Sequence, residues 1–372
     1  MKIVVNTRSL IVNKLDGIGW FTYQTLKRIS QNHPEHEFIF LFDRPYDSQF
    51  IFSNNVRPIV LFPPARHPFL YLIYYEFSVR KILHKIKPDV FLSTDGILSL
   101  GAKTKQIAVI HDINFFHYPQ DLTFFYRIYY NFLMPKFAKK ASKIVTVSNF
   151  SKLDLVQTYG MLPSKIEVIY NGINEGYTEI NEEVKQKTKL KFSSGKEYFL
   201  FVGSMSPRKN LVRLISAFAE FKQKTQSDFK LILAGGSFWG EQEIANEIRK
   251  HHLDKEVLFT GRVSQEDLQL VMGSAFALTF VSYFEGFGIP LVEAMASGVP
   301  IVCSKDSCMP EIAGEAALYV DAFDANNIAS GLISMYEDSE LRKRLIEAGR
   351  KQRLYFSWDI AAQKLWNVIE HI

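Results

Sequence analysis

The sequence predicts an α/β protein of two domains, each built on a doubly wound parallel sheet. Short apolar runs typical of buried strands alternate with helical patterns along the chain, as in parallel sheets covered by helices. The chain has 372 residues, more than one hydrophobic core usually serves. The polar, aliphatic-poor stretch 174–196 divides the two halves and is expected to be the interdomain region. We therefore expect domains over residues 1–173 and 174–355, with 356–372 as a separate C-terminal helix.

In the first half, five apolar runs are expected to form strands: Lys2–Val5, Phe38–Phe42, Asp89–Leu92, Ile107–Ile110 and Lys143–Val147. Helical spacing of apolar residues falls between most of these runs, over Trp20–Ser30, Leu72–Ile86 and Phe125–Ala141. Because ligands of such sheets bind beyond the carboxyl ends of the strands, the loops after these runs are the places to look for a site.

The second half repeats the pattern. Its expected strands are Tyr198–Gly203, Lys230–Ala234, Val257–Thr260, Phe276–Val281 and Pro300–Cys303. Helical patterns separate them at Leu211–Lys224, Glu241–His251 and Glu266–Met272. The tail 356–372 carries Trp358, Leu365, Trp366 and Ile369 at helical spacing, so this helix must bury one face. The spacing does not say which domain it covers.

Composition excludes several classes of protein. The formal net charge is +5, from 44 Lys+Arg against 39 Asp+Glu, whereas a nucleic-acid binder would usually show a denser basic patch. The two cysteines, Cys303 and Cys308, exclude a disulfide framework and offer no zinc-type spacing. The opening residues MKIVVNTRSL are expected to form a strand rather than a signal peptide, and an apolar run of about 18 residues is lacking. We expect a cytoplasmic protein.

The most informative segment is FEGFGIPLVEAMASG, Phe284 to Gly298. It holds two carboxylates, Glu285 in a glycine-containing loop and Glu293 about one turn inside a predicted helix. Helix N-termini favour anions, and carboxylates accept hydrogen bonds from hydroxyls. This layout suits a nucleotide-sugar. An ordinary strand–loop–helix, with Pro290 at the start of the helix and Gly298 after its end, would contain the same residues.

The whole segment resembles the glutamate–seven residues–glutamate signature of retaining glycosyltransferases, in particular family 4 of the GT-B fold. The resemblance implies two Rossmann-like domains that face each other across a cleft, with the C-terminal helix crossing back to the first domain. It also implies that Glu285 lies against the donor sugar and that Glu293 binds the ribose hydroxyls. Backbone groups at the start of the helix would then serve the donor, through Gly286, Phe287, Gly288, Ile289, Leu291 and Val292.

A second group of candidates follows the strand that ends at Gly203, in the string FLFVGSMSPRKN. Arg208 and Lys209 are two cations before a helix start, where the dipole disfavours them, so we expect an anionic partner. They can hold a diphosphate and stabilise its departure without a metal, and the family resemblance implies the same contact. Many members place an arginine directly after the strand-end glycine, where this chain has Ser204. A solvated basic turn is the competing interpretation.

Two further motifs lie in the first half. The glycines of Asp16-Gly17-Ile18-Gly19 are expected to allow positive φ and close approach to a ligand, or to form only a turn; in similar enzymes this loop approaches the donor phosphate. His111, in the string HDINFFHYP, ends a strand, and a lone histidine is usually capped by local backbone. The string resembles the family motif whose histidine contacts the donor sugar and the reaction centre, which implies that role for His111. Asp112 is expected to be structural.

Two assignments depend on weaker signals. Arg262 and Val263 follow another strand, and the resemblance implies that this stretch faces the nucleobase. Aromatic residues crowd the first half beside lysines and arginines, around Phe69–Phe77 and Phe124–Tyr130. Such a surface can rest on anionic lipid at the inner face of the cell membrane, or the aromatics can be core and the basic residues solvated. Both interpretations stay open here.

Together these observations predict a retaining, metal-independent glycosyltransferase. The catalytic candidates are His111, Lys209 and Glu285. No bound cofactor is expected beyond the nucleotide-sugar co-substrate, with GDP-mannose favoured over a UDP-sugar because the strings resemble bacterial mannosyltransferases of surface-polysaccharide synthesis. The acceptor would be a glycan or lipid-linked oligosaccharide. The alternatives are a sugar-nucleotide 2-epimerase of the same fold and a non-catalytic scaffold in a polysaccharide assembly complex.

Overall fold

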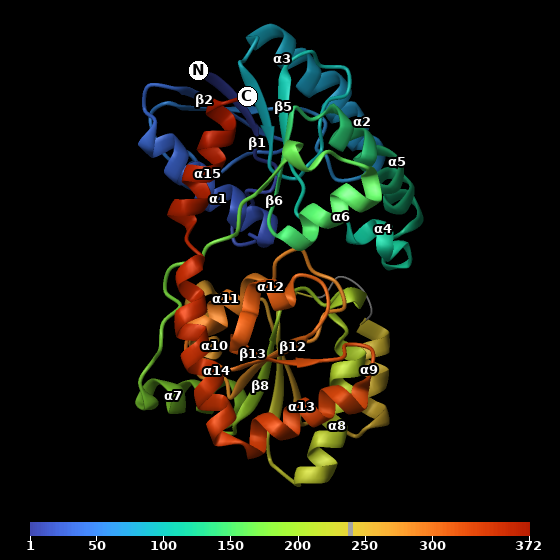
Figure 1. Cartoon of the computed structure of the whole chain (residues 1–372), viewed down its shortest axis with the longest axis vertical. Helices are drawn as coiled ribbons and strands as arrows, with labels where there is room; N and C mark the ends of the chain where they lie inside the picture. Colours follow the sequence, from blue (N-terminus) through green and yellow to red (C-terminus); the bar gives the residue numbers. More distant parts are fainter. Residues whose placement is uncertain (237–240) are drawn as a thin grey trace. The chain divides into compact units, whose positions relative to one another are not determined.

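The computed structural model describes residues 1–236 and 241–372, which separate into two compact units. Unit 1 contains Met1–Gly172 together with Ser357–Ile372, and unit 2 contains Ile173–Phe356 (Figure 1). Each unit has its own sheet and its own core, as expected for a chain of this length.

The sheet of unit 1 is parallel throughout, in the order β3-β2-β1-β4-β5-β6-β7. Its strands are β1 (Lys2–Asn6), β2 (Glu37–Phe42), β3 (Val56–Val60), β4 (Val90–Ser93), β5 (Lys105–Val109), β6 (Lys143–Thr146) and β7 (Ile166–Val168). The chain runs from β1 outward to one edge and then returns to place β4 beside β1. This reversal makes β1 and β4 the topological switch point, where ligands of doubly wound sheets bind.

The helical elements of unit 1 are α1 (Gly17–Asn32), η1 (Ser48–Phe50), α2 (Pro68–Ile73), the π-helix η2 (Tyr74–Val79), α3 (Arg80–Ile86), α4 (Asn114–His117), η3 (Pro119–Asp121), α5 (Phe124–Lys140), α6 (Asn149–Tyr159) and η4 (Pro163–Lys165). The sequence predicted one helix over Leu72–Ile86, but α2, η2 and α3 run on from Pro68. The earlier start has a local cause: Pro68 occupies the first turn and the His67 ring accepts from the Phe69 backbone N–H at 3.3 Å.

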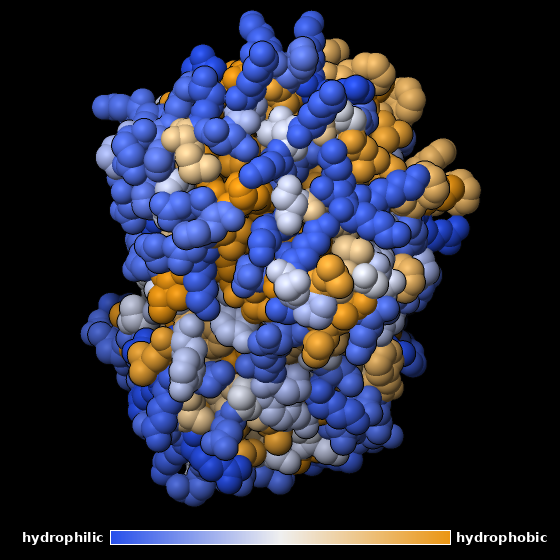
Figure 2. All heavy atoms as spheres, turned by 45° about the horizontal axis from the view of Figure 1, so that its top comes forward, coloured by the Kyte–Doolittle hydropathy of each residue, from blue (hydrophilic) through white to orange (hydrophobic). Residues whose placement is uncertain are grey.

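The aromatic residues of α2, η2 and α5 divide between the core and the surface. Tyr74 and Tyr75 are fully buried in the core of unit 1, which they share with Phe91 and Phe137. Others are exposed, namely Phe69, Phe77, Phe124, Phe125 and Phe132. Figure 2 shows hydrophobic residues gathered at the upper right, on the side where Figure 1 draws α2 and α5. Core packing therefore accounts for only part of the aromatic content of this segment.

The sheet of unit 2 is also parallel, in the order β10-β9-β8-β11-β12-β13 among the residues that the structure describes. Its strands are β8 (Tyr198–Val202), β9 (Lys230–Ala234), β10 (Val257–Gly261), β11 (Ala277–Phe280), β12 (Ile301–Ser304) and β13 (Ala317–Val320). The order reverses between β8 and β11, which are therefore the switch point of this sheet. The central strands are apolar on both faces because helices cover both.

The helical elements of unit 2 are α7 (Glu182–Ser193), η5 (Pro207–Lys209), α8 (Leu211–Thr225), α9 (Glu241–Lys250), α10 (Gln265–Gly273), α11 (Ile289–Ala296), α12 (Met309–Ala313), η6 (Gly314–Ala316), α13 (Ala325–Glu337), α14 (Ser339–Gln352) and η7 (Arg353–Tyr355). Gly235 is required where β9 ends: it has φ +145°, and a Cβ there would lie 2.0 Å from the carbonyl oxygen of Gly203 after β8. This close approach packs together the loops that follow the two strands.

The last helix, α15 (Trp358–Glu370), packs on α1 of unit 1. Arg28 of α1 pairs with Asp359 at 2.6 Å, and the ring of Trp366 stacks on His33 with centroids 3.8 Å apart. Gly172 leaves room for the contact, since a Cβ there would lie 2.2 Å from the backbone nitrogen of Trp358. The prediction that the C-terminal helix returns to the first domain is confirmed.

The polar stretch 174–196 is not an interdomain linker. It lies inside unit 2 and contains α7, which packs against α10 and pairs Lys191 with Asp267 at 2.7 Å. The stretch looks like a linker in sequence because α7 is a surface helix that buries few apolar side chains; its buried residues are Thr188, Lys189 and Ser193. The chain passes from unit 1 to unit 2 at Gly172–Ile173, one residue before the boundary expected from the sequence.

Candidate functional site

The candidate site of unit 2 is built by two loops at its switch point. One loop runs from Gly203 to Asn210 after β8, and the other runs from Val281 to Gly288 after β11. Because β8 and β11 are neighbours in the sheet, their carboxyl ends bring the two loops together. The backbone N–H of Tyr283 donates to the carbonyl of Arg208 at 3.1 Å, which ties one loop to the other.

Arg208, Lys209 and Glu285 form one ion cluster at this point. The Arg208 Nη1 atom lies 2.7 Å from Oε2 of Glu285, and the Lys209 ammonium contacts Oε1 of the same carboxylate. Lys209 and Glu285 are buried, and Arg208 is about one quarter exposed. Burial alone would raise the pKa of Glu285, but the charges of Arg208 and Lys209 outweigh it and lower the pKa to about 2. Glu285 is therefore ionised at neutral pH.

The partner of Arg208 and Lys209 in the structure differs from the one that the sequence predicts. Arg208 and Lys209 were expected to face an anionic ligand, and in the structure they face Glu285. The cluster itself contains two cations and one carboxylate, and Arg208 is its most exposed member. A buried cluster with surplus charge attracts a further anion, because few water molecules screen it.

Several contacts hold the two cations in place. Asn210 adopts the left-handed conformation, with φ +63°, and its amide donates to the carbonyls of Val281 at 3.0 Å and Ala322 at 2.6 Å. The Lys209 ammonium lies 4.8 Å from the ring centroid of Phe280. Ser204 begins the same loop and is half-buried. Asn210 was not among the residues singled out from the sequence, although an asparagine directly before a helix is a recognised signal of a special backbone position.

The start of α11 supplies backbone groups rather than side chains. Gly288 has φ +86° and turns the chain into the helix, which begins at Ile289 with Pro290 in its first turn. The side chains of Leu291 and Val292 are fully buried, so only the backbone of these two residues can serve a ligand. Gly286 and Phe287 precede the turn and are buried as well.

Glu293 lies one turn inside α11 and is buried. The Asn174 amide donates to its Oε1 atom at 2.9 Å, and the Tyr177 hydroxyl hydrogen-bonds the same carboxyl group. Burial raises the pKa of Glu293 to about 7, against the smaller, opposite effect of these hydrogen bonds. The group is poised to gain or lose a proton near neutrality. Asn174 and Tyr177 were not predicted from the sequence; they lie in the stretch 174–196, which was expected to be the interdomain region.

Arg262 and Val263 follow β10, two strands away from β8. Arg262 is exposed and Val263 is half-buried. The segment connects to the surroundings of Glu293, because the Gln265 amide lies 3.4 Å from the Tyr177 hydroxyl. The structure thus relates this segment to Glu293 through Tyr177, and the Arg208–Lys209–Glu285 cluster is a separate group at the switch point.

Three buried serine hydroxyls around the ends of the central strands have no hydrogen-bond partner among the residues that the structure describes. They belong to Ser206 after β8, Ser282 after β11 and Ser304 at the end of β12. Buried hydroxyls are usually satisfied, but others without a partner lie elsewhere in the described chain, such as those of Ser99 and Ser227, so these three do not by themselves mark a ligand site. Single serines in loops gave no signal in the sequence.

His111 belongs to unit 1, where it follows β5. Its Nε2 atom lies 3.0 Å from the carbonyl oxygen of Thr94, and its ring packs edge-on against Phe21 of α1 at 5.2 Å. Burial lowers the pKa of His111, more than the bond to Thr94 raises it. Because a carbonyl can only accept, the neutral ring carries its proton on Nε2 and offers Nδ1 as an acceptor. Asp112 caps the next turn by accepting from the Asn114 backbone at 3.1 Å.

The glycines at the start of α1 do not have the conformation predicted for them. Asp16 caps the helix by accepting from the Gly19 backbone N–H at 2.8 Å, so Gly17 is already its first residue. Neither Gly17 nor Gly19 has positive φ. Gly19 lies instead where a side chain would fit tightly, since a Cβ there would lie 3.1 Å from both the Ser9 carbonyl oxygen and the Leu15 side chain. The structure does bring this helix start close to His111, through Phe21.

The switch point of unit 1 holds a polar network that sequence reasoning missed. The Asn6 amide donates to Asp95 at 2.9 Å and to the Tyr75 hydroxyl at 2.7 Å, and Arg8 pairs with Asp95 at 2.7 Å. Burial works against the charge of Asp95, but Arg8 and the hydrogen bonds lower its pKa. The groups of this network satisfy one another, so we interpret it as a structural element that fixes the loops after β1 and β4.

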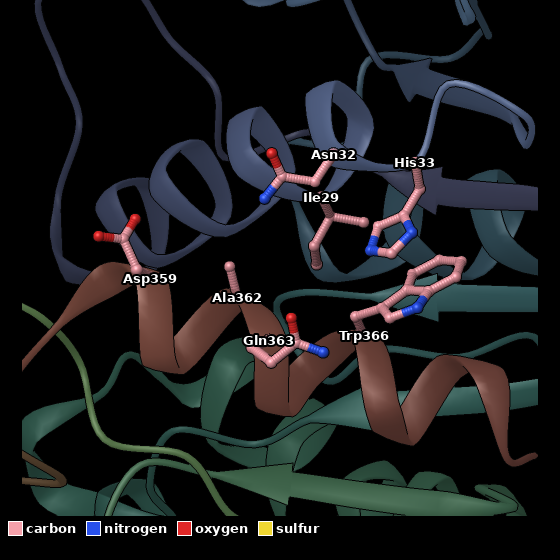
Figure 3. Close-up of a pocket in the computed structure, with 7 residues that line it drawn as sticks. All are labelled: Ile29, Asn32, His33, Asp359, Ala362, Gln363 and Trp366. Atoms are coloured by element: carbon pink, nitrogen blue, oxygen red, sulfur yellow. The ribbon is translucent and has the colours of Figure 1, made fainter.

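A pocket of about 190 Å³ lies elsewhere in unit 1, between α1 and α15 (Figure 3). It is lined by Ile29, Asn32, His33, Asp359, Ala362, Gln363 and Trp366. Beside it, His33, Glu35 and His36 place potential metal-ligand atoms within 4.8 Å of one another. None of the residues predicted for the site lines this pocket, and we assign it no part in the chemistry.

The fold and the site define a glycosyltransferase of the GT-B class. The chain has two doubly wound parallel units, the last helix returns to the first unit, and a cation–glutamate cluster lies at the switch point of the second. Two family models match the chain: Glycosyltransferase Family 4 over residues 15–177 and Glycosyl transferases group 1 over residues 182–352. The chain belongs to glycosyltransferase family 4.

Curated relatives support the assignment at the level of sequence. The O-antigen chain mannosyltransferase RfbU of Salmonella typhimurium is 31% identical over 280 residues, which are 75% of this chain and 71% of that protein. The O-antigen chain mannosyltransferase B of Escherichia coli is 28% identical over 264 residues, 68% of this chain and 67% of that protein. Both relatives are named as O-antigen chain mannosyltransferases.

Solved structures share the fold. Sucrose-phosphate synthase from Thermosynechococcus elongatus has a TM-score of 0.81 at 17% identity and covers 100% of this chain and 98% of that chain. The lipopolysaccharide glycosyltransferase WaaG has a TM-score of 0.78 at 16% identity, with 99% of each chain covered. The Anabaena protein HepE, in complex with UDP and glucose, has a TM-score of 0.77 at 19% identity and full coverage of both chains. The GT-B fold predicted from the sequence is confirmed.

Proposed function

We propose that this glycosyltransferase is a retaining, metal-independent enzyme that moves mannose from GDP-mannose to a glycan or lipid-linked acceptor. The observation that carries the proposal is the ion cluster of Arg208, Lys209 and Glu285 at the switch point of unit 2. It combines surplus positive charge for a diphosphate with a buried carboxylate for a sugar. The mannosyltransferase relatives favour mannose as the sugar that is moved.

In this proposal each end of the donor meets its own glutamate. Glu293 accepts hydrogen bonds from the ribose hydroxyls, and Arg208 and Lys209 hold the diphosphate together with the backbone N–H groups at the start of α11. Glu285 and the backbone of Phe287 and Gly288 serve the sugar. His111 contacts the sugar through Nδ1, the nitrogen that its bond to Thr94 leaves as an acceptor.

The chemistry follows from where charge develops. Cleavage of the glycosidic bond builds negative charge on the diphosphate and positive charge on the sugar ring. The negative charge on the diphosphate is stabilised by Arg208, Lys209 and the α11 N-terminus, which are already in place. The positive charge on the sugar ring is stabilised by the ionised Glu285. The acceptor attacks from the face that the diphosphate leaves, and the leaving phosphate accepts the acceptor's proton. The anomeric configuration is then retained. The surplus positive charge supports a mechanism in which side chains neutralise the diphosphate.

The proposal is tested by incubating the purified chain with GDP-mannose and with UDP-glucose, each with a lipid-linked oligosaccharide acceptor and in the presence of a chelator. We expect mannose transfer from GDP-mannose, undiminished by the chelator, and an α-linked product by NMR. An inverted product or dependence on added divalent metal would contradict the mechanism. Isomerisation of the sugar-nucleotide without acceptor would favour a 2-epimerase, and failure to bind any sugar-nucleotide would favour a scaffold.

A further inference from the structure

Helix α5 carries apolar side chains toward solvent as well as toward the core. Tyr129, Leu133 and Phe137 point into the core of unit 1, where they are buried. Phe125 and Phe132, on the adjacent solvent-facing stripe of the helix, are each 62% exposed. A surface helix normally turns polar residues outward. The outer face of α5 is therefore not explained by the folding of unit 1.

The neighbouring helix extends this apolar surface. In the continuous segment of α2 and η2, Phe69 is 64% and Phe77 is 70% exposed. The segment lies beside α5, because the Tyr126 hydroxyl donates to the Arg66 carbonyl at 2.9 Å and the ring of His67 lies 5.6 Å from that of Phe125. The two helices thus present their exposed aromatic residues on one side of unit 1, where Figure 2 shows the hydrophobic gathering.

We call this surface the aromatic-basic face and define it by the following exposed residues: Phe69, Leu72, Phe77, Phe124, Phe125, Ile128, Phe132, Lys136 and Lys139. Scattered exposed hydrophobic residues are normal on proteins, whereas a contiguous group of this kind marks an interaction site. Seven large apolar side chains on two adjacent helices form such a group.

The charges that accompany the face are almost all positive. Residues 68–86 and 124–140 contain seven lysines and arginines and a single acid, Glu76. That carboxylate is turned to the protein, since it accepts from the backbone N–H groups of Leu100 at 2.5 Å and Gly101 at 3.0 Å. On α5 the outward stripe of Phe125, Ile128 and Phe132 continues as Lys136 and Lys139 at the same helical spacing. The Lys136 ammonium lies 3.5 Å from the ring centroid of Phe132.

We propose that the aromatic-basic face docks unit 1 onto a membrane surface rich in anionic phospholipid. Aromatic rings favour the boundary between headgroups and acyl chains, and lysines beside them meet the lipid phosphates. A second copy of the chain fits less well, because a symmetric contact would bring the same cations against each other. The attachment is peripheral: among residues 1–236 and 241–372, no helix combines the length and the apolar character of a membrane span.

Co-sedimentation of the full chain with vesicles tests the proposal. We expect binding to mixed phosphatidylglycerol–phosphatidylcholine vesicles and little binding to pure phosphatidylcholine vesicles. The double variant Phe125→Ser/Phe132→Ser should lower the partition coefficient by at least about tenfold, because it removes two interfacial rings. Lys136→Glu/Lys139→Glu should do the same and should weaken the salt dependence. The second pair keeps the test decisive if the serine pair folds poorly.

Matched controls come from unit 2. Phe259 is 51% and Leu354 is 73% exposed, so Phe259→Ser/Leu354→Ser removes similar apolar surface elsewhere and should leave vesicle binding unchanged. Wild-type protein that ignores anionic vesicles would overturn the proposal, as would variants of the face that bind like wild type. A wild-type dimer that Phe125→Ser/Phe132→Ser converts to a monomer would overturn it too, by assigning the face to self-association. Vesicle binding needs no substrate, so its failure is distinct from failure of the proposed activity.

Discussion

Arg208 meets Glu285 with 2.7 Å between the guanidinium Nη1 and the carboxylate Oε2, and the Lys209 ammonium occupies the other carboxylate oxygen. The carboxylate thus partly neutralises the cations proposed to hold the diphosphate. A diphosphate brings more negative charge than one carboxylate, so it can share the same cations and leave Glu285 to the sugar.

Replacing Glu285 by glutamine should separate chemistry from binding. Glu285→Gln removes the charge proposed to face the sugar ring, and we expect kcat to fall by roughly 10²–10³, as for other preorganised electrostatic groups. The affinity for GDP alone should not fall, because the cations lose their internal competitor. Steady-state kinetics and calorimetry measure the two effects. Glu183→Gln, at an exposed ion pair on α7, is the control and should change neither. Wild-type turnover in Glu285→Gln would refute the assignment.

Glu293 should make stability depend on pH in an unusual direction. Its pKa is raised from 4.5 to about 7 in the folded state, so the folded chain holds a proton that the unfolded chain has lost. The stabilisation is complete below pH 4.5 and disappears as the pH rises through about 7, a total of about 3 kcal/mol. Denaturant unfolding should show wild type losing stability relative to Glu293→Gln over this window. A constant difference between the two proteins would contradict the raised pKa.

The same titration should appear in donor binding. The ionised Glu293 accepts hydrogen bonds from both ribose hydroxyls, whereas the protonated form accepts fewer. The dissociation constant for GDP should therefore decrease as the pH rises through about 7, and Glu293→Gln should abolish that dependence. Asn174→Ala removes a hydrogen bond that lowers the pKa of Glu293, so the midpoint should move to higher pH. An unmoved midpoint in Asn174→Ala would exclude Asn174 from this role.

His111 should act as a neutral group. Because burial lowers its pKa, its protonation should not change between pH 7 and 8. We therefore expect no midpoint in that range for kcat at saturating donor, since the Glu293 titration acts on donor binding. His111→Ala should lower kcat by roughly 10²-fold if Nδ1 contacts the sugar, with GDP affinity unchanged. His371→Ala, at the exposed end of the chain, is the control. Equal loss of GDP affinity and kcat would show that His111 acts on the nucleotide instead.

The contact between the loops after β8 and β9 should make folding stability very sensitive to substitution of Gly235. Gly235→Ala would place a Cβ 2.0 Å from the carbonyl oxygen of Gly203, at a φ of +145°. We expect a loss of more than about 3 kcal/mol or failure to fold, since backbone atoms cannot move aside. Gly160→Ala is the matched control: it also has positive φ, +63°, but meets nothing within 4 Å, and should cost about 1 kcal/mol. Equal thermal stability of the two variants would contradict the packing argument.

The sequence analysis predicted the two sheets because their central strands are short, buried and apolar. It missed β3, β7 and β13, which are edge strands. Edge strands are not covered on both sides: β3 contains Arg57 and Pro58, and β7 has three residues. The composition of β3 therefore resembles that of a loop, and β7 is too short to show a pattern. The third missed strand, β13, is apolar (ALYV), so this reason does not apply to it. The helix α7 was not predicted because its buried residues, Thr188, Lys189 and Ser193, are polar and give no apolar pattern.

The candidate site was predictable where residues lie close together in sequence, as with Glu285 and Glu293 or Arg208 and Lys209. The contacts between these groups were not, because Lys209 and Glu285 are 76 positions apart and meet only through the strand order. The contact between Asn174 and Glu293 could not be predicted either, because these residues are 119 positions apart. A single sequence indicates which residues carry chemistry, and the topology determines which carboxylate each cation meets.

Calorimetric titration of GDP-mannose and GDP into wild type and Lys209→Ala tests the central claim most directly. If the cluster grips the diphosphate, Lys209→Ala should weaken both ligands by about 10²-fold or more, while Lys305→Ala, at an exposed ion pair with Asp321, should bind like wild type. Unchanged affinity in Lys209→Ala, with the protein folded, would contradict the account.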